Sequence, residues 1–173
     1  MKRSLGFALV ILAFTALAVN AAQAETIQAT LTGYQEVPSV STVASGEFRG
    51  FISRNDDSIA YELNYSGLQG DVRQAHIHVA QPSVNGSIVI WLCGTVSNPG
   101  PGGTQTCPQT GTITGTISAA NVIAGSTASQ QLSAGDLDEI VRAIRAGSAY
   151  VNVHTDLSTG GEIRGQINAA AKK

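Results

Sequence analysis

The sequence has 173 residues, a formal net charge of −2 and charged residues at only 13% of its positions. The charge is close to neutral and no run of Lys or Arg is present, so the protein has no basic surface that could bind a phosphate backbone. We therefore expect no nucleic-acid partner. The length suits one domain that buries its own core without help from a structural metal.

The N-terminal segment has the three parts of a secretory signal peptide. Lys2 and Arg3 precede an apolar run, and the Ala-Gln-Ala tripeptide that ends at Ala24 supplies the small residues of a cleavage site. The run is shorter than the roughly 20 residues of a membrane helix, and no later segment approaches that length, so we expect no membrane span. The sequence therefore predicts a signal peptide over residues 1–24, cleaved after Ala24. A single β domain follows over residues 25–173, and it is secreted or periplasmic.

The chain has two cysteines, Cys93 and Cys107, separated by a Pro- and Gly-rich stretch. In an oxidising compartment such a pair forms a disulfide, and we predict one here. A zinc or redox site is the alternative, but the C-x-x-C spacing that would favour it is missing.

Short runs rich in β-branched and aromatic residues recur along the chain, separated by Gly, Asn, Asp and Ser. One segment instead has apolar residues at helical spacing, with Ser133 as its expected N-cap and Gly147 beyond its end. The pattern predicts a mainly β fold, an antiparallel β-sandwich or Greek-key barrel with one short helix before the late strands. The expected strands are residues 26–32, 47–54, 58–65, 72–80, 87–93, 110–118, 149–155 and 162–168.

Two short segments near the ends of the domain resemble each other, GEFRGFI and GEIRGQI. Strand alternation places Glu47 with Arg49, and Glu162 with Arg164, on a common face. We expect both pairs to be structural ion pairs at the surface or contacts at a sheet edge.

All three histidines occur in expected strands. His76 and His78 are two residues apart, so their rings lie on one face of a strand, about 6–7 Å apart at Cβ. Ile77 points to the opposite face, which we assign to the core. In the strand 149–155 two valines alternate with His154 in the same way. We therefore expect all three imidazoles on the outer, solvent-accessible face.

Neighbouring strands of a sheet lie about 4.8 Å apart. If the strands that carry the three histidines are neighbours, their imidazoles can reach one metal ion. Nitrogen donors without a thiolate suit copper, zinc or nickel better than calcium or magnesium. We expect copper, which leads the affinity order of divalent ions, with zinc as the alternative. Tyr150, Asn152 and Asp156 are expected to lie behind the ligands and orient them.

Residues 29–168 resemble the CHRD domain family, named from chordin and also found in secreted bacterial proteins. The matching segments are residues 31–38 (LTGYQEVP), 75–78 (AHIH), 150–155 (YVNVHT) and 160–165 (GGEIRG). The resemblance implies an extracytoplasmic β-sandwich.

A second resemblance is to the Cu/Zn superoxide dismutases, which carry H-x-H on a copper strand and a V-x-H-like element before an acidic, Gly-rich turn. His76, His78 and His154 match those copper positions. The histidine that bridges copper to zinc has no counterpart here, the zinc ligands are missing, and no anion-guiding Arg is identifiable. The resemblance therefore extends to copper binding and not to dismutase activity.

Two functions fit the sequence. The first is a copper-binding protein that serves copper sequestration, delivery or tolerance. The second is a metal-free extracellular interaction or structural module, in which the disulfide loop and residues 36–38 contact an extracytoplasmic protein. We expect no enzymatic activity other than a copper redox reaction, because no hydrolytic set of residues is evident. The oligomeric state stays open.

Overall fold

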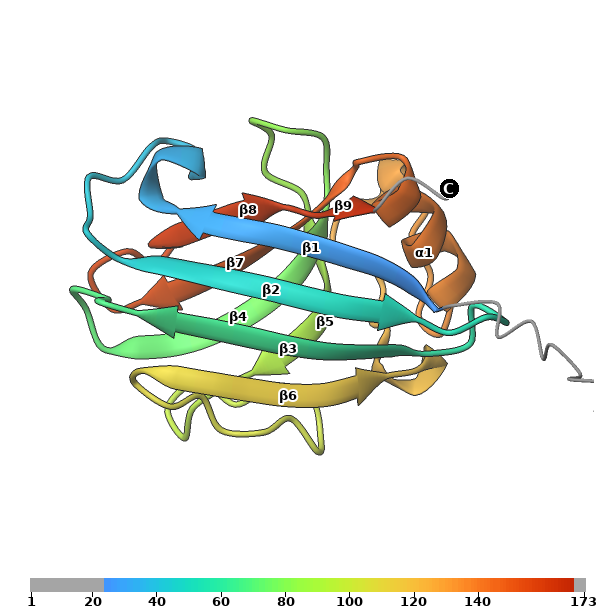
Figure 1. The fold of residues 1–173 in the computed structure, drawn as a ribbon, viewed down its shortest axis with the longest axis horizontal. Coiled ribbons are helices and arrows are strands. Elements are labelled where there is room, and N and C mark those ends of the chain that lie inside the picture. Colours follow the sequence, from blue (N-terminus) through green and yellow to red (C-terminus); the bar gives the residue numbers. More distant parts are fainter. Residues whose placement is uncertain (1–23, 170–173) are drawn as a thin grey trace, which may run out of the picture.

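The computed structural model describes residues 24–169 of the chain (Figure 1). The predicted signal peptide, up to residue 23, lies outside the described residues. Among residues 24–169, no helix has the length and apolar character needed to cross a membrane.

The described chain forms one nine-stranded sheet, in which every pair of neighbouring strands is antiparallel and which nearly closes into a barrel. The strand order is β5-β4-β7-β8-β1-β2-β3-β6, and β9 pairs with β1. In Figure 1, β1, β2, β3 and β6 lie in front of β4, β5 and β7. The mainly β fold predicted from the sequence is confirmed. The strands are β1 (Glu25–Thr32), β2 (Ser45–Ile52), β3 (Ile59–Ser66), β4 (Val72–Val79), β5 (Ser87–Cys93), β6 (Gly111–Ile117), β7 (Ala149–Thr155), β8 (Ile163–Gln166) and β9 (Asn168–Ala169).

The core lies between the two halves of the sheet. Buried and exposed residues alternate strictly in β2 and β3, so that Phe48 and Leu63 are fully buried. Each such side chain contributes about 1.5–3 kcal/mol through the apolar surface that it removes from water. The exposed face of β2 carries Glu47 and Arg49, whose Oε2 and Nη2 atoms are 3.5 Å apart, so this pair is the surface ion pair that was expected.

The disulfide loop spans the seam between the two end strands of the sheet. The Cys93 and Cys107 sulfur atoms are 2.00 Å apart, which confirms the predicted pairing. Within the loop, the Gln105 side chain donates to the Tyr61 hydroxyl of β3 and to the Thr114 carbonyl of β6. The loop therefore connects the end of β5 to β3 and β6, across the point where the barrel does not close.

The helix α1 (Leu137–Arg145) precedes β7, as the sequence predicts, and it buries its apolar face. Its N-cap is Asp136, which accepts a hydrogen bond from the Glu139 backbone at 3.1 Å, and the expectation of Ser133 was wrong. An N-cap has to reach the third residue of the first turn, and Asp136 stands directly before that turn. Gly147 follows the helix at φ +69°, the left-handed conformation that favours glycine.

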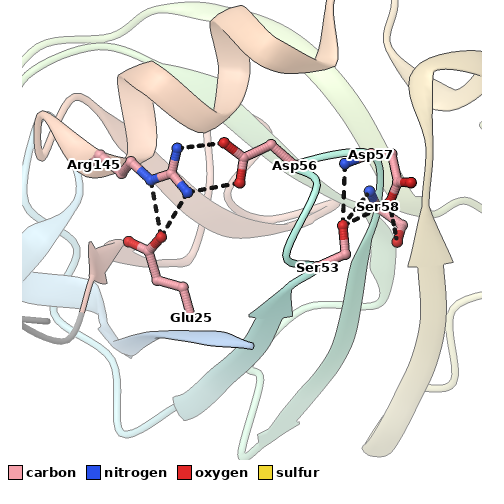
Figure 2. Close-up of polar contacts among 6 residues, drawn as sticks. All are labelled: Glu25, Ser53, Asp56, Asp57, Ser58 and Arg145. Carbon is pink, nitrogen blue, oxygen red and sulfur yellow. Dashed lines mark hydrogen bonds and ion pairs between the residues drawn. The ribbon is translucent and has the colours of Figure 1, made fainter. Parts of the chain in front are cut away.

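Figure 2 shows how α1 is attached to the strand ends: the Arg145 guanidinium lies between two carboxylates. It donates to Glu25 at the start of β1, with distances of 2.7 and 2.9 Å, and to Asp56 in the turn between β2 and β3, with distances of 2.6 and 2.7 Å. Beside it, the Ser53 hydroxyl accepts from two backbone N–H groups of the same turn. The hydrogen bonds that Arg145 donates to Asp56 and Glu25 raise its pKa above its ordinary range.

Candidate metal centre

The three histidines lie on two neighbouring strands, because β4 pairs with β7. In this register His76 is opposite Asn152 and His78 is opposite Tyr150. His154 lies two pairs beyond Asn152 along β7, opposite Gln74. The period of two in each strand then places these side chains on one face of the sheet, as the sequence predicts.

This face is not exposed to solvent. His76 is 0% exposed, and His78 and His154 are each 6% exposed, so the expectation of a solvent-accessible histidine face was wrong. Connecting segments cover it: Gly86, after β4, contacts His78, and Thr159, after β7, contacts His154. Glu36, after β1, packs beside Asn152 on Gly161. Such coverage depends on contacts between distant parts of the chain, which strand alternation cannot predict.

The imidazole nitrogens converge on one point. The Nδ1 atom of His76 lies 3.2 Å from the Nε2 atom of His154, and one nitrogen from each of the three rings lies within 4.8 Å of the others. Two ligands that each lie about 2.0–2.1 Å from a shared tetrahedral ion stand about 3.3 Å apart. The spacing of His76 and His154 therefore fits two adjacent ligands of one metal ion.

Backbone carbonyls set the orientation of two of the rings. His78 Nδ1 lies 3.0 Å from the Gly86 carbonyl oxygen, and His154 Nδ1 lies 3.0 Å from the Thr159 carbonyl oxygen. Each Nδ1 donates its hydrogen there, which leaves Nε2 with a free lone pair, the arrangement found around histidine metal ligands. The Nε2 atoms of His76 and His78 are buried and have no hydrogen-bond partner among the described residues.

The rings are uncharged at neutral pH. Burial lowers the pKa of His76 to about 2, and its two histidine neighbours lower it further. Burial also lowers the pKa of His78 to about 4, against the opposing effect of its bond to Gly86. The pKa of His154 is lowered by burial as well. Three neutral imidazoles offer lone pairs without first losing protons, so the group can hold a metal ion.

Aromatic side chains form the walls of the site. The Tyr150 ring stacks on His78 with a centroid distance of 4.6 Å and an interplanar angle of 5°. The Trp91 ring meets His76 edge to face, at 4.3 Å between centroids. Trp91 was not predicted from the sequence. It lies opposite His76 in the pairing of β4 with β5.

Two charged residues of the site were not recognised in the sequence. Arg164 is 1% exposed; its guanidinium lies over the Tyr150 ring and donates to Val84 at 2.8 Å and Asn85 at 3.2 Å. Glu36 is 5% exposed, and burial raises its pKa to about 7, against the charge of Arg164. The pairing of β8 with β7 places Arg164 opposite Asn152, a relationship that the sequence alone does not reveal.

Glu162 and Arg164 do not form the surface ion pair that the sequence suggested. Glu162 is 1% exposed and accepts hydrogen bonds from Thr42, Thr155 and the backbone of residues 69–70, so it ties the β1–β2 and β3–β4 loops to the end of β7. β8 is covered on both faces, unlike β2, and the related Glu-x-Arg motifs therefore have different surroundings.

Tyr150, Asn152 and Asp156, which were expected to orient the ligands, make three different kinds of contact. Tyr150 stacks on His78, and the Asn152 Oδ1 atom is 3.0 Å from His154 Nε2. Asp156 Oδ1 accepts a hydrogen bond from the Asp71 backbone at 2.8 Å, at the start of β4.

The sequence profile of the CHRD domain matches residues 27–167, which include every strand from β2 to β8 and all three histidines. The chain therefore belongs to the CHRD domain family. No curated protein and no solved structure matches it significantly.

Proposed function

We propose that this CHRD-domain protein binds one copper ion through His76, His78 and His154, in the secreted or periplasmic space. The observation that carries the proposal is the convergence of three buried, neutral imidazoles whose nitrogens lie within 4.8 Å of one another. Without a bound cation, the buried Nε2 atom of His78 has no hydrogen-bond partner among the described residues, which is unfavourable in a folded protein.

Copper is favoured over zinc by the affinity order of divalent ions at nitrogen sites. The disulfide supports an oxidising compartment, such as the secreted or periplasmic space. A buried site suits a protein that holds an ion, and we propose sequestration, delivery or tolerance as its role. When bound, copper would supply a redox-active centre shielded from solvent.

The test is a titration of the purified protein with copper and with zinc, in equilibrium competition against a chelator. The comparison is a variant with all three histidines replaced by glutamine, and its fold is checked by circular dichroism. We expect tight one-to-one copper binding by the wild type and its loss in the variant. Copper retained by the folded variant, or no copper binding by the wild type, would refute the proposal.

A matched control separates the site from adventitious surface binding. Glu47 and Glu62 line a shallow depression on the outer face of β2 and β3. A Glu47→Gln/Glu62→Gln variant removes these carboxylates and leaves the histidines intact. We expect it to bind copper as the wild type does.

A further inference from the structure

The Asn152 side chain lies between the histidine cluster and Glu36. Its Oδ1 atom is 3.0 Å from His154 Nε2, and its Nδ2 atom is 3.5 Å from the Gly160 carbonyl oxygen. The amide therefore presents its oxygen to the histidines and its nitrogen to the outer loop.

The single ring hydrogen of neutral His154 cannot serve both of its ring nitrogens. Each of its ring nitrogens faces an oxygen acceptor at 3.0 Å, Thr159 O at Nδ1 and Asn152 Oδ1 at Nε2. A neutral imidazole carries one hydrogen, and burial disfavours the doubly protonated form. If the hydrogen is on Nδ1, two lone pairs face each other at Nε2, and a cation between them removes the repulsion.

The opposite orientation of the Asn152 amide would remove this repulsion but create others. Its Oδ1 would then face the Gly160 carbonyl oxygen, and it would lie beside Glu36 Oε1, which packs on the same glycine, Gly161. The Glu36 carboxylate therefore selects the orientation in which Oδ1 points to the histidines.

The backbone makes room for this arrangement at Gly161. A Cβ atom there would lie 2.2 Å from Glu36 Oε1 and 2.8 Å from Asn152 Nδ2, so both side chains pack against the same glycine. Glu36 Oε1 is buried and has no hydrogen-bond partner among the described residues, and it packs on Gly161 beside the Asn152 amide nitrogen.

We infer that Asn152 Oδ1 is a fourth ligand of the bound ion, held in place by Glu36, and that it makes the centre selective for Cu(II) over Cu(I). This inference rests on the proposed function. A carboxamide oxygen is a hard donor that suits a divalent ion, whereas Cu(I) prefers soft ligands. Asn152 Oδ1, His154 Nε2 and His76 Nδ1 have successive separations of 3.0 and 3.2 Å, close to those of ligands that share one ion.

The test compares Cu(II) and Cu(I) affinities of the wild type with those of Asn152→Leu, which keeps the size and removes the oxygen. We expect the Cu(II) affinity to fall about 10–100-fold, while the Cu(I) affinity changes little. The reduction potential should then rise by about 60–120 mV. Asn64→Leu, on the exposed side of β3, is the matched control and should change neither affinity.

Two further variants keep the inference testable if Asn152→Leu does not fold. Asn152→Asp retains an oxygen and should restore Cu(II) selectivity with a shifted electron paramagnetic resonance spectrum. Glu36→Gln should lower the ratio of Cu(II) to Cu(I) affinity without removing a histidine, a change that a purely structural role would not produce.

The outcomes separate the two claims. If the wild type binds copper but the Asn152 variants keep its Cu(II) affinity, spectrum and potential, the fourth ligand is refuted and the three-histidine site stands. If the wild type binds no copper, the proposed function and this inference both fail.

Discussion

The guanidinium carbon of Arg164 lies 3.4 Å from the ring centroid of Tyr150, and Tyr150 in turn stacks on His78 of the candidate metal centre. Arg164 also donates to Val84 and Asn85, in the loop whose Gly86 carbonyl accepts from His78. A single side chain therefore holds both the ring that packs on His78 and the loop that orients it.

We expect Arg164→Leu to lower copper affinity about tenfold, since groups that orient metal ligands contribute by this order. The physical reason is that His78 loses the fixed position of the Gly86 carbonyl. A competition titration measures the effect, with Arg49→Leu on the exposed face of β2 as the control. Unchanged affinity in a folded Arg164→Leu protein would show that the loop holds its position without this residue.

Glu36 gives the metal-free protein a distinct pH dependence. Burial raises its pKa from the ordinary 4.5 to about 7, so between these values the folded state holds a proton that the unfolded state has released. The contribution of Glu36 to stability is therefore present below pH 4.5 and is lost as the pH rises to about 7. The difference between these two pKa values of Glu36 corresponds to about 3 kcal/mol of unfolding free energy.

We expect Glu36→Gln to remove this loss, so that the stability of the variant relative to wild type increases as the pH rises from 5 to 8. Urea unfolding in the presence of a chelator, at a series of pH values, measures the difference. Glu47→Gln controls for the removal of a carboxylate from the surface. Parallel stability curves for Glu36→Gln and wild type would contradict the shifted pKa.

The sequence predicts much of the sheet because its strands obey a period of two. β2 and β3 alternate cleanly, and the shared face of His76, His78, Asn152 and His154 follows from the same rule. What the rule cannot supply is which strands are neighbours or what covers them. The pairing of β4 with β7, which brings the histidines together, joins residues more than 70 positions apart.

The missed residues illustrate the same limit. Glu36 and Arg164 appeared in the sequence as a loop carboxylate and a surface cation, and both are buried beside the site in the folded chain. Their burial results from the packing of segments 33–39 and 81–86 onto β7 and β8. A local pattern of polar and apolar residues does not predict packing between segments that are distant in the sequence.

The disulfide should stabilise the fold without taking part in metal binding. Replacing Cys93 and Cys107 by alanine opens a loop with a sequence separation of 14 residues, which corresponds to about 3 kcal/mol in the chain-entropy account. We expect a lower urea midpoint for the double variant and copper affinity within about threefold of wild type. A large loss of affinity with an intact fold would indicate that the seam between β5 and β6 supports the site.

The contacts of Arg145 in Figure 2 should be sensitive to salt. Two partly exposed carboxylates share this guanidinium, and a network of this kind is worth about 1 kcal/mol at low ionic strength. We expect Arg145→Ala to lose about this much stability at low salt and less in 1 M NaCl. Arg142→Ala removes an ion pair on the exposed side of the same helix and is the control. An Arg145→Ala effect that does not depend on salt would point to lost packing instead.

The proposed site holds one copper ion among His76, His78 and His154. The most direct test is a crystal structure of the copper-loaded protein, with anomalous diffraction collected on both sides of the copper absorption edge. We expect a single strong anomalous peak within coordination distance of His76 Nδ1, His78 Nε2 and His154 Nε2. A peak elsewhere on the protein, or no peak in crystals grown with equimolar copper, would contradict the account.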